Sequence, residues 1–373
     1  MKKTASNADI WTRCEGYIKA ASDYVRVYGS HESPAAEEGI MAHGVAEALI
    51  RVMAKDGNPT PKVPDRWAGS VIPVDMKIKC RDYAHFCYSL MRRSNVYGGK
   101  YLWVEDEIES TFLADGLMTR VDFAIYDPSV RTLHVLDLKY GHRAVEAEGN
   151  AQLLIGARSI IDRIDTPVEK VTMSIYQPNG PNASMPLAQW TADTLSVMTM
   201  TNDIRQMYES NGNALRPGSH CRYCDARGTC IGLRHAVYSA WDVVAYYNHI
   251  PEELPADRLE DMLAEMETFR DLLRAYQTGL EALCVSRLKR GDVMPKWEYT
   301  TSLTDRKWAH DEADIIELGK SMGIELEKRT VVSPKQAELA GMPKELVDTL
   351  VKREATGLKL RKKSLKTLKQ AFQ

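Results

Sequence analysis

One segment constrains the fold more than any other, because two apolar runs flank a single turn sequence. The runs cover residues 120–126 and 132–139, and Asp127-Pro128-Ser129 lies between them. This pattern predicts a β-hairpin. Both faces of the hairpin are apolar, so we expect other elements to cover it on both sides.

Two aspartates interrupt the apolar pattern of this hairpin. A four-residue loop over residues 128–131 would place Asp122 directly opposite Asp137, with their Cβ atoms roughly 4.5 to 5.5 Å apart. Lys139 lies two residues after Asp137 and therefore points to the same face of its strand. Two carboxylates in apolar surroundings repel each other and lose hydration, so another group must compensate them.

Two kinds of compensation are open. A divalent cation, Mg²⁺ or Mn²⁺, would neutralise the carboxylates and would also hold a phosphate oxygen. Lys139 would then stabilise developing negative charge or orient a water molecule. Alternatively, Lys139 pairs with Asp137, while Asp122 caps a backbone group or meets an arginine. The tripeptide Asp-x-Lys is too common to decide between them.

The rest of the chain predicts an α/β fold around this hairpin. Helical spacing of apolar residues is found over 6–56, 75–93, 146–162, 191–211 and, as one long amphipathic helix, 257–290. Strand patterns cover residues 101–111 and 168–177, and the Pro- and Gly-rich residues 56–73 predict a loop. Residues 298–373 mix strand-like and short helical patterns.

Three cysteines form a tight group, Cys221-x2-Cys224-x5-Cys230, which we call the cysteine knot. Thiolates at such spacing ligate zinc or an iron-sulfur centre. His220 and His235 lie nearby in the sequence, so the local pattern slightly favours zinc. The other cysteines in helical patterns are expected to be buried thiols: Cys80, Cys87 and Cys284.

These motifs, in this order, resemble the PD-(D/E)XK nuclease superfamily, specifically RecB-like exonucleases of the CRISPR-associated and AddB types. Asp122 and Asp137-Leu138-Lys139 match its acidic residue and its Asp/Glu-x-Lys. His43, in Glu38-Gly39-Ile40-Met41-Ala42-His43, matches a histidine on a preceding helix, and Gln152 matches a glutamine on the following one. Gly156 stands where these nucleases have a tyrosine.

The likeness covers about residues 8–240 and is greatest to a phage and prophage subgroup that shares the opening Trp11-Thr12-Arg13-Cys14-Glu15-Gly16. It implies a restriction-endonuclease-like core, a mixed central sheet flanked by helices, in residues 1–240. A mainly helical extension with a basic tail would follow in residues 241–373.

The resemblance also implies a function and a set of site residues. The protein would be a Mg²⁺- or Mn²⁺-dependent DNA exonuclease in phage DNA recombination, repair or replication. The metal ligands would be His43, Asp122, Asp137 and the carbonyl of Leu138, and the catalytic residues would be Asp122, Asp137, Lys139 and Gln152.

Iron-sulfur members of this group take three cysteines from the end of the domain and one from far upstream. The resemblance therefore implies a 4Fe-4S cluster on Cys14, Cys221, Cys224 and Cys230, which would join the two ends of the nuclease domain as a structural staple. Zinc at the cysteine knot is the alternative.

Charge is unevenly distributed along the 373 residues, whose formal net charge is -2. Residues 351–373 hold eight Lys or Arg against the single acid Glu354, which leaves 41 basic and 50 acidic residues before them. Such a tail can attract DNA by releasing its counterions, or it can be a solvated end.

Composition argues against secretion and membrane insertion. No apolar stretch approaches the roughly 18 to 20 residues that cross a bilayer, and the chain opens with polar sequence. Seven scattered cysteines fit a reducing compartment. We therefore expect a cytoplasmic protein, in the host cytoplasm if phage-encoded.

Two other classes of function stay open. A non-catalytic nucleic-acid-binding subunit of a recombination complex would explain the absent tyrosine, and a zinc-binding regulatory protein would explain the cysteine knot but not the hairpin. DNA is the partner that the resemblance implies. A phage single-strand annealing or recombination protein is a further candidate partner.

Overall fold

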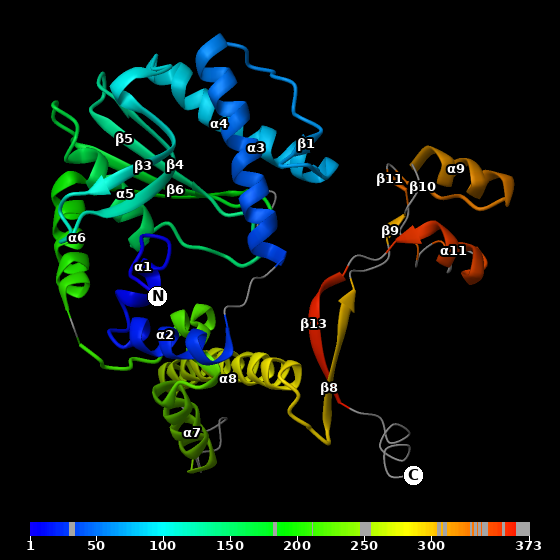
Figure 1. Cartoon of the computed structure of the whole chain (residues 1–373). Coiled ribbons are helices and arrows are strands. Elements are labelled where there is room, and N and C mark those ends of the chain that lie inside the picture. The colour runs from blue at the N-terminus through cyan, green and yellow to red at the C-terminus, as the bar shows by residue number, and fades with distance from the viewer. Residues whose placement is uncertain are drawn as a thin grey trace. The chain divides into compact units, whose positions relative to one another are not determined.

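A computed structural model describes the chain over residues 1–29, 34–181, 185–210, 212–246, 255–303, 307–308, 312–328, 330–331, 334, 337, 342–352 and 355–362. The chain forms two compact units, Met1–Ala282 and Leu283–Gln373 (Figure 1). The boundary expected after residue 240 falls inside the first unit, and the division into a nuclease domain and an extension stays a prediction.

A mixed five-stranded sheet forms the centre of the first unit, in the order β3-β4-β5-β6-β7. These strands are Leu102–Ser110, Leu117–Asp127, Thr132–Leu138, Lys170–Tyr176 and Leu187–Asp193. β5 and β6 run parallel, whereas the other neighbouring strands are antiparallel. The first four strands were expected from the sequence. β7 was missed because it is a half-exposed edge strand without an apolar run.

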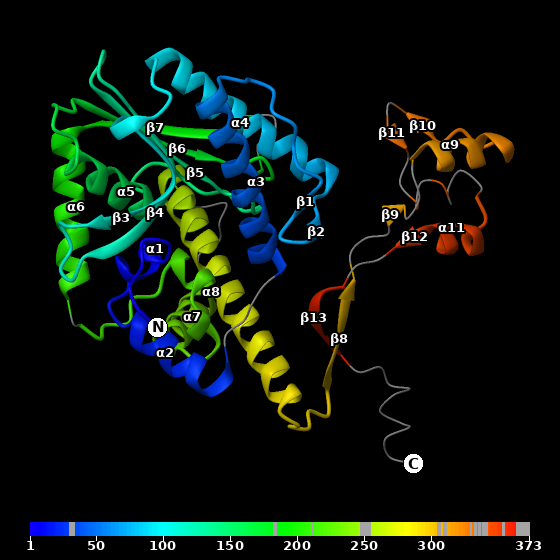
Figure 2. The same cartoon turned by 45° about the horizontal axis from the view of Figure 1, so that its top comes forward.

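Helices cover both faces of this sheet (Figures 1 and 2). α3 (Pro34–Asp56) and α4 (Val74–Ser94) share one hydrophobic cluster with Phe123, Ile125 and Leu136. The opposite cluster joins the sheet to α1 (Ala8–Trp11), α2 (Tyr17–Tyr28), α5 (Ala151–Ile161) and α6 (Thr194–Glu209). The expected mixed sheet with flanking helices is therefore confirmed.

The N-terminal segment is fastened to a much later part of the same unit. Lys3 Nζ donates hydrogen bonds to the carbonyl oxygens of Met207, Tyr208 and Ser210. The Gly16 amide donates to Ala214 O at 3.0 Å, and Arg216 forms an ion pair with Glu15 at 2.8 Å. The two ends of the segment that carries the sheet thus lie side by side.

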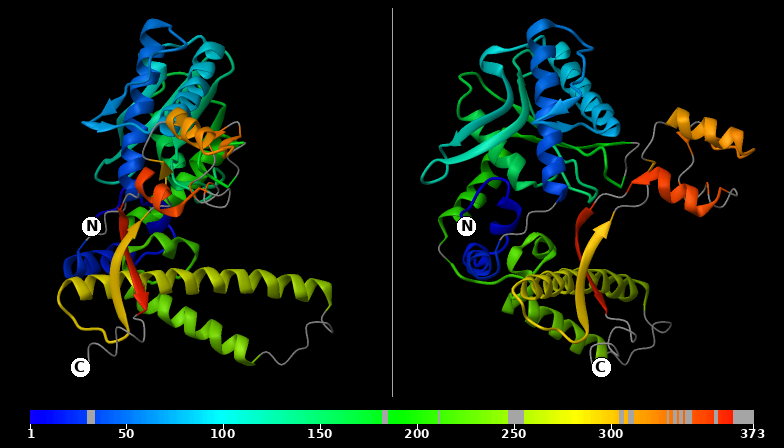
Figure 3. Two further views of the ribbon diagram at one scale, coloured as in Figure 1. Left: turned by 90° about the vertical axis from the view of Figure 1, so that its right-hand side faces the viewer. Right: turned by 45° about the vertical axis from the view of Figure 1, so that its right-hand side comes forward.

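After the sheet the first unit becomes helical. The cysteine knot spans two 3-10 turns, η2 (Ser219–Tyr223) and η3 (Asp225–Gly228), and leads into α7 (Ile231–Tyr246) and the predicted long helix α8 (Ala256–Lys289). Figure 3 shows α7 and α8 as neighbours. Residues of η2, α7 and α8 share one small apolar cluster: Cys221, Leu233, Leu272 and Ala275.

The second unit mixes short strands and helices, as expected. β8 (Trp297–Leu303) pairs antiparallel with β13 (Ala355–Lys362). α9 (Glu312–Ser321) and α11 (Lys344–Leu350) contribute Ile315 and Val347 to a small core. Residues 353–354 and 363–373 of the basic tail lie outside the described residues, so the role of the tail stays a prediction.

The remaining short elements complete the description. The loop expected over 56–73 contains a two-stranded hairpin, β1 (Arg66–Trp67) and β2 (Ser70–Val71), and η1 (Gly99–Tyr101) precedes β3. The second unit also has β9 (Lys307–Trp308), β10 (Glu327–Lys328), β11 (Thr330–Val331) and β12 (Val351–Lys352). Within the described parts of the chain, none of the helices combines the length and apolarity needed to span a bilayer.

Candidate functional site

The hairpin of β4 and β5 has the register that the sequence predicts. Five residue pairs connect the strands, from Phe123 opposite Leu136 to Asp127 opposite Thr132, and residues 128–131 form the loop. The same register, extended by one residue, sets Asp122 opposite Asp137. Both aspartates are buried, at 7% and 4% exposed.

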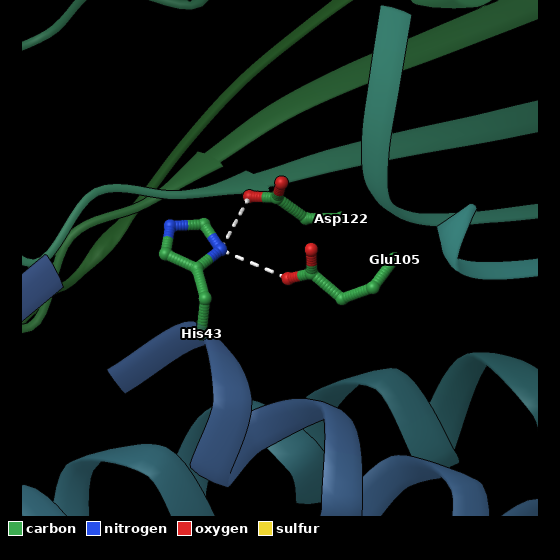
Figure 4. A group of neighbouring side chains, drawn as sticks. All are labelled: His43, Glu105 and Asp122. Carbon is green, nitrogen blue, oxygen red and sulfur yellow. Dashed lines mark hydrogen bonds and ion pairs between the residues drawn. The ribbon is translucent and has the colours of Figure 1, made fainter. Parts of the chain in front are cut away.

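Three side chains from three elements converge beside this pair (Figure 4). His43 of α3 points its Nδ1 at Glu105 Oε1 of β3, at 2.9 Å, and at Asp122 Oδ2 of β4, at 3.4 Å. One ligand atom of each residue lies within 4.8 Å of the others. Carboxylate oxygens suit Mg²⁺ and Mn²⁺, and an imidazole nitrogen adds affinity for a transition metal.

Sequence reasoning missed Glu105. The β3–β4 register pairs Val104 with Phe123 and Asp106 with Val121, so Glu105 is the residue opposite Asp122. Its side chain is 7% exposed and forms a second ion pair, with Arg120 Nε at 3.0 Å. Three carboxylates, Glu105, Asp122 and Asp137, therefore lie at facing positions of three adjacent strands.

The backbone at this row of carboxylates departs from regular strand geometry. Glu105 has a φ of 49°, in the left-handed region that residues other than glycine rarely adopt. Val121 packs in the cluster on the α5 side of the sheet, whereas Phe123 packs on the α3 side, so the alternation of β4 shifts at Asp122. Strained backbone held in place by its surroundings is a common property of functional sites.

Lys139 lies at the other end of the row. Its Nζ is 2.8 Å from Asp137 Oδ2, as expected for residues on the same face, and donates to Gln152 Oε1 at 2.9 Å. Asp122 accepts a hydrogen bond from the Leu138 amide at 2.7 Å. The structure thus brings together the predicted His43, Asp122, Asp137, Lys139 and Gln152. Metal ligation by the Leu138 carbonyl stays a prediction.

The arrangement that the sequence left open as an alternative to metal binding is present: Lys139 pairs with Asp137, and Asp122 accepts a hydrogen bond from the Leu138 amide. These contacts compensate Asp122 only in part, because no arginine among the described residues contacts it and its other partner, His43, is more distant. The other carboxylate beside Asp122, Glu105, shares its charge between His43 and Arg120.

Gln152 is held in place by the start of α5. The Asn150 side chain caps this helix by accepting a hydrogen bond from the Leu153 amide at 3.1 Å. Gly156 of the same helix faces the sheet, where a Cβ atom would come 3.2 Å from Val121 Cγ2. A tyrosine at position 156 would therefore enter the core, which gives its absence a packing reason.

Burial and mutual repulsion shift the proton affinities of the site. Burial, with the charge of Asp137, raises the pKa of Asp122 to about 7. Burial opposes a charge on His43, but its hydrogen bond to Glu105 and the nearby carboxylates raise its pKa to about 9. In the same way Asp137 and Asp122 overcome the burial of Lys139 and raise its pKa. The site therefore favours bound cations.

We expect the metal-free protein to lose stability as pH rises. The folded-state pKa values of Asp122 and His43 exceed their ordinary values of 3.8 and 6.5, so the folded state binds more protons than the unfolded state. The contribution of Asp122 is complete below about pH 4 and is lost by about pH 7. The contribution of His43 is complete below about pH 6.5 and is lost by about pH 9.

The substitution Asp122→Asn tests this pH dependence, because asparagine keeps an acceptor for the Leu138 amide. In EDTA at pH 8 it should raise the melting temperature by about 5 °C, and at pH 4 it should change little. Mn²⁺ should stabilise the native sequence and not the variant. Thermal melts that show the variant less stable at pH 8 would contradict the prediction.

The cysteine knot meets the predicted fourth cysteine. One small cavity is lined by all four thiols, with Cys14 coming from the segment after α1 and Cys221, Cys224 and Cys230 from the knot. Burial, together with the other three thiols, raises the pKa of Cys224 to about 12. Such thiols stay protonated unless a metal binds.

The donor atoms around this cavity are not drawn together as closely as those of His43, Glu105 and Asp122. Among the described residues, no three Cys, His, Asp or Glu ligand atoms of the knot lie within 4.8 Å of one another. Sulfurs at about 2.3 Å from a tetrahedral zinc are only about 3.8 Å apart. Zinc and the 4Fe-4S cluster both stay predictions.

Of the two histidines considered for zinc, His220 lines this cavity and His235 does not. Nε2 of His220 is buried and has no hydrogen-bond partner among the described residues. His220 is therefore the local donor that a zinc ion would use.

One comparison with known proteins bears on the whole chain. A family model described as a protein of unknown function (DUF2800) matches residues 2–364. The match includes the row of carboxylates, the cysteine knot and most of the second unit.

Proposed function

Since this chain belongs to the DUF2800 family, whose function is unknown, we propose from the site itself that it is a metal-dependent deoxyribonuclease, an exonuclease that hydrolyses phosphodiester bonds. One observation carries the proposal: Glu105, Asp122 and Asp137 lie at facing positions of three adjacent strands, between His43 and Lys139.

The metal would bind at the His43 end of this row. His43, Glu105 and Asp122 would hold a Mn²⁺ or Mg²⁺ ion, with Asp137 and the carbonyl of Leu138 as further ligands. When bound, such an ion polarises the phosphate and lowers the pKa of a coordinated water molecule. The surplus of carboxylates supports this role, because the neighbouring side chains neutralise it only in part.

The protein's own residues supply the rest of the chemistry. Asp137 and Gln152 both contact Lys139 Nζ and hold the ammonium group beside the metal ligands, where negative charge develops on the phosphate. Gln152 would also contact the cut strand or the attacking water. Arg120 holds the carboxylate of Glu105 through their ion pair at 3.0 Å.

The fold supports a finer assignment to the PD-(D/E)XK superfamily. A mixed sheet flanked by helices, with the acidic residue on one strand and Asp-x-Lys on the next, is compatible with a RecB-like nuclease core. On that assignment the substrate is DNA. Phage DNA recombination, repair or replication would be the process, with a phage annealing or recombination protein as a candidate partner.

We also propose a 4Fe-4S cluster on Cys14, Cys221, Cys224 and Cys230. The support is the single cavity that Cys14 lines together with the three cysteines of the knot. Its role would be structural, because the cluster would join the N-terminal segment to the cysteine knot without touching the row of carboxylates.

A nuclease assay tests the proposed function most directly. End-labelled single- and double-stranded DNA should be degraded in Mg²⁺ or Mn²⁺ and not in EDTA, with higher activity in Mn²⁺ because His43 offers a nitrogen ligand. DNA binding without cleavage in either metal would overturn the proposal in favour of a non-catalytic nucleic-acid-binding subunit.

A further inference from the structure

A pocket borders the row of carboxylates and is not used by the mechanism above. Its volume is about 170 Å³, below the roughly 300 to 1,000 Å³ of typical small-molecule sites, so it has room for only one part of a nucleotide. Its lining residues are Thr4, Ala5, Ser6, Glu107, Met118, Thr119, Arg120 and Gln152. Two of them reach the site: Gln152 contacts Lys139, and Arg120 pairs with Glu105.

The wall formed by the N-terminal segment is built in advance of any ligand. The Thr4 amide donates to Asn7 Oδ1 at 2.8 Å, and Trp11 Nε1 donates to Thr4 O at 2.8 Å. The hydroxyls of Thr4 and Ser6 lie 3.1 Å apart. A pre-organised wall lowers the entropy cost of binding.

The chemistry of the lining distinguishes between the parts of a nucleotide. Arg120 and Glu107 carry opposite charges, so the pocket offers no net positive charge to a phosphate group. It offers hydroxyls, an amide and an exposed thioether, Met118, which can lie against the face of an aromatic ring. Thr119, 1% exposed, also lines the pocket, and its hydroxyl has no hydrogen-bond partner within the described structure.

Donors, acceptors and an apolar surface in one neutral pocket suit a flat, hydrogen-bonding ring. We propose that this pocket receives an unpaired nucleobase of the substrate strand, next to the phosphodiester bond that is cut. The inference rests on the proposed function. It adds that one nucleotide beside the cut must leave its base pair, so a duplex end has to fray before it is cut.

Abasic substrates test the pocket directly. A labelled single strand receives one abasic nucleotide at each position around the cut in turn, and kcat/KM is measured in Mn²⁺. At one position the abasic nucleotide should lower kcat/KM about tenfold, because that base loses its contacts. Met118→Ala should cause a similar loss on the intact strand and little further loss on that abasic strand.

Matched controls separate the possible failures. Met200→Ala, which changes an exposed methionine of α6, should leave kcat/KM unchanged on both strands. If the native protein cleaves in Mn²⁺ but cuts all abasic strands equally well, the pocket proposal is wrong and the nuclease proposal stands. If cleavage depends on a terminal phosphate and not on any base, the pocket binds the phosphate, which also overturns the inference. No metal-dependent cleavage at all contradicts the nuclease proposal instead.

Discussion

Replacing Lys139 by alanine is expected to lower kcat for metal-dependent DNA hydrolysis by about 10²- to 10³-fold, and Asp137→Ala by at least as much. Lys139 Nζ is held 2.8 Å from Asp137 and 2.9 Å from Gln152, so its charge is already in place before the phosphate arrives. The alanine variant loses that charge, and no other cation contacts Asp137 among the described residues. Single-turnover cleavage of end-labelled DNA in Mn²⁺ measures the effect.

The folded state of these variants needs its own check. Lys139→Ala leaves the buried carboxylate of Asp137 without its partner, which costs stability in the absence of metal. Thermal melts and circular dichroism spectra should therefore be recorded in Mn²⁺. Asp137→Asn serves as a second variant of nearly equal shape. Lys100→Ala is a matched control, because Lys100 also pairs with an aspartate, Asp165, but at an exposed position. Undiminished activity of both alanine variants would refute the assignment.

The second large effect is expected at the cysteine knot. The native protein, purified without oxygen, should be brown and hold about four irons per chain, whereas Cys14→Ser should hold less than one. Because metal binding contributes directly to folding, the loss of several kcal/mol should lower the melting temperature by roughly 10 °C or more. Iron analysis, absorbance near about 400 nm and thermal melts check this result.

Two further variants decide what the cysteine knot binds. Cys284→Ser changes a cysteine outside the knot and should keep both iron and stability. A colourless native protein with one zinc, unaffected by Cys14→Ser but depleted by His220→Ala, would instead support the local zinc site.

The hairpin was predictable from the sequence because its information is local. Asp127-Pro128-Ser129 fixes the turn, and a fixed turn fixes which residues of the two strands face each other, Asp122 and Asp137 among them. His43 lies far from the hairpin in sequence, and Gln152 lies on the helix that follows it. Only the resemblance to RecB-like nucleases suggested these two residues.

Glu105 was not predictable for two physical reasons. Its strand is joined to β4 by residues 111–116, whose conformation sets the register and has no turn signature as strong as that of the hairpin. Its side chain also depends on a left-handed backbone, and glutamate gives no sign of that conformation in a sequence. Gly156 stands where RecB-like nucleases have a tyrosine, and the reason for this difference is visible only in the packing of the helix against Val121.

The docking of the N-terminal segment has a consequence for biosynthesis. The partners of Lys3 and Gly16 begin at Met207, and Cys221 follows Cys14 by 207 residues. At about 5 to 20 residues per second, a ribosome takes roughly 10 to 40 s to make that interval. The nascent segment must therefore wait, with Trp11 uncovered, until the whole sheet has been translated.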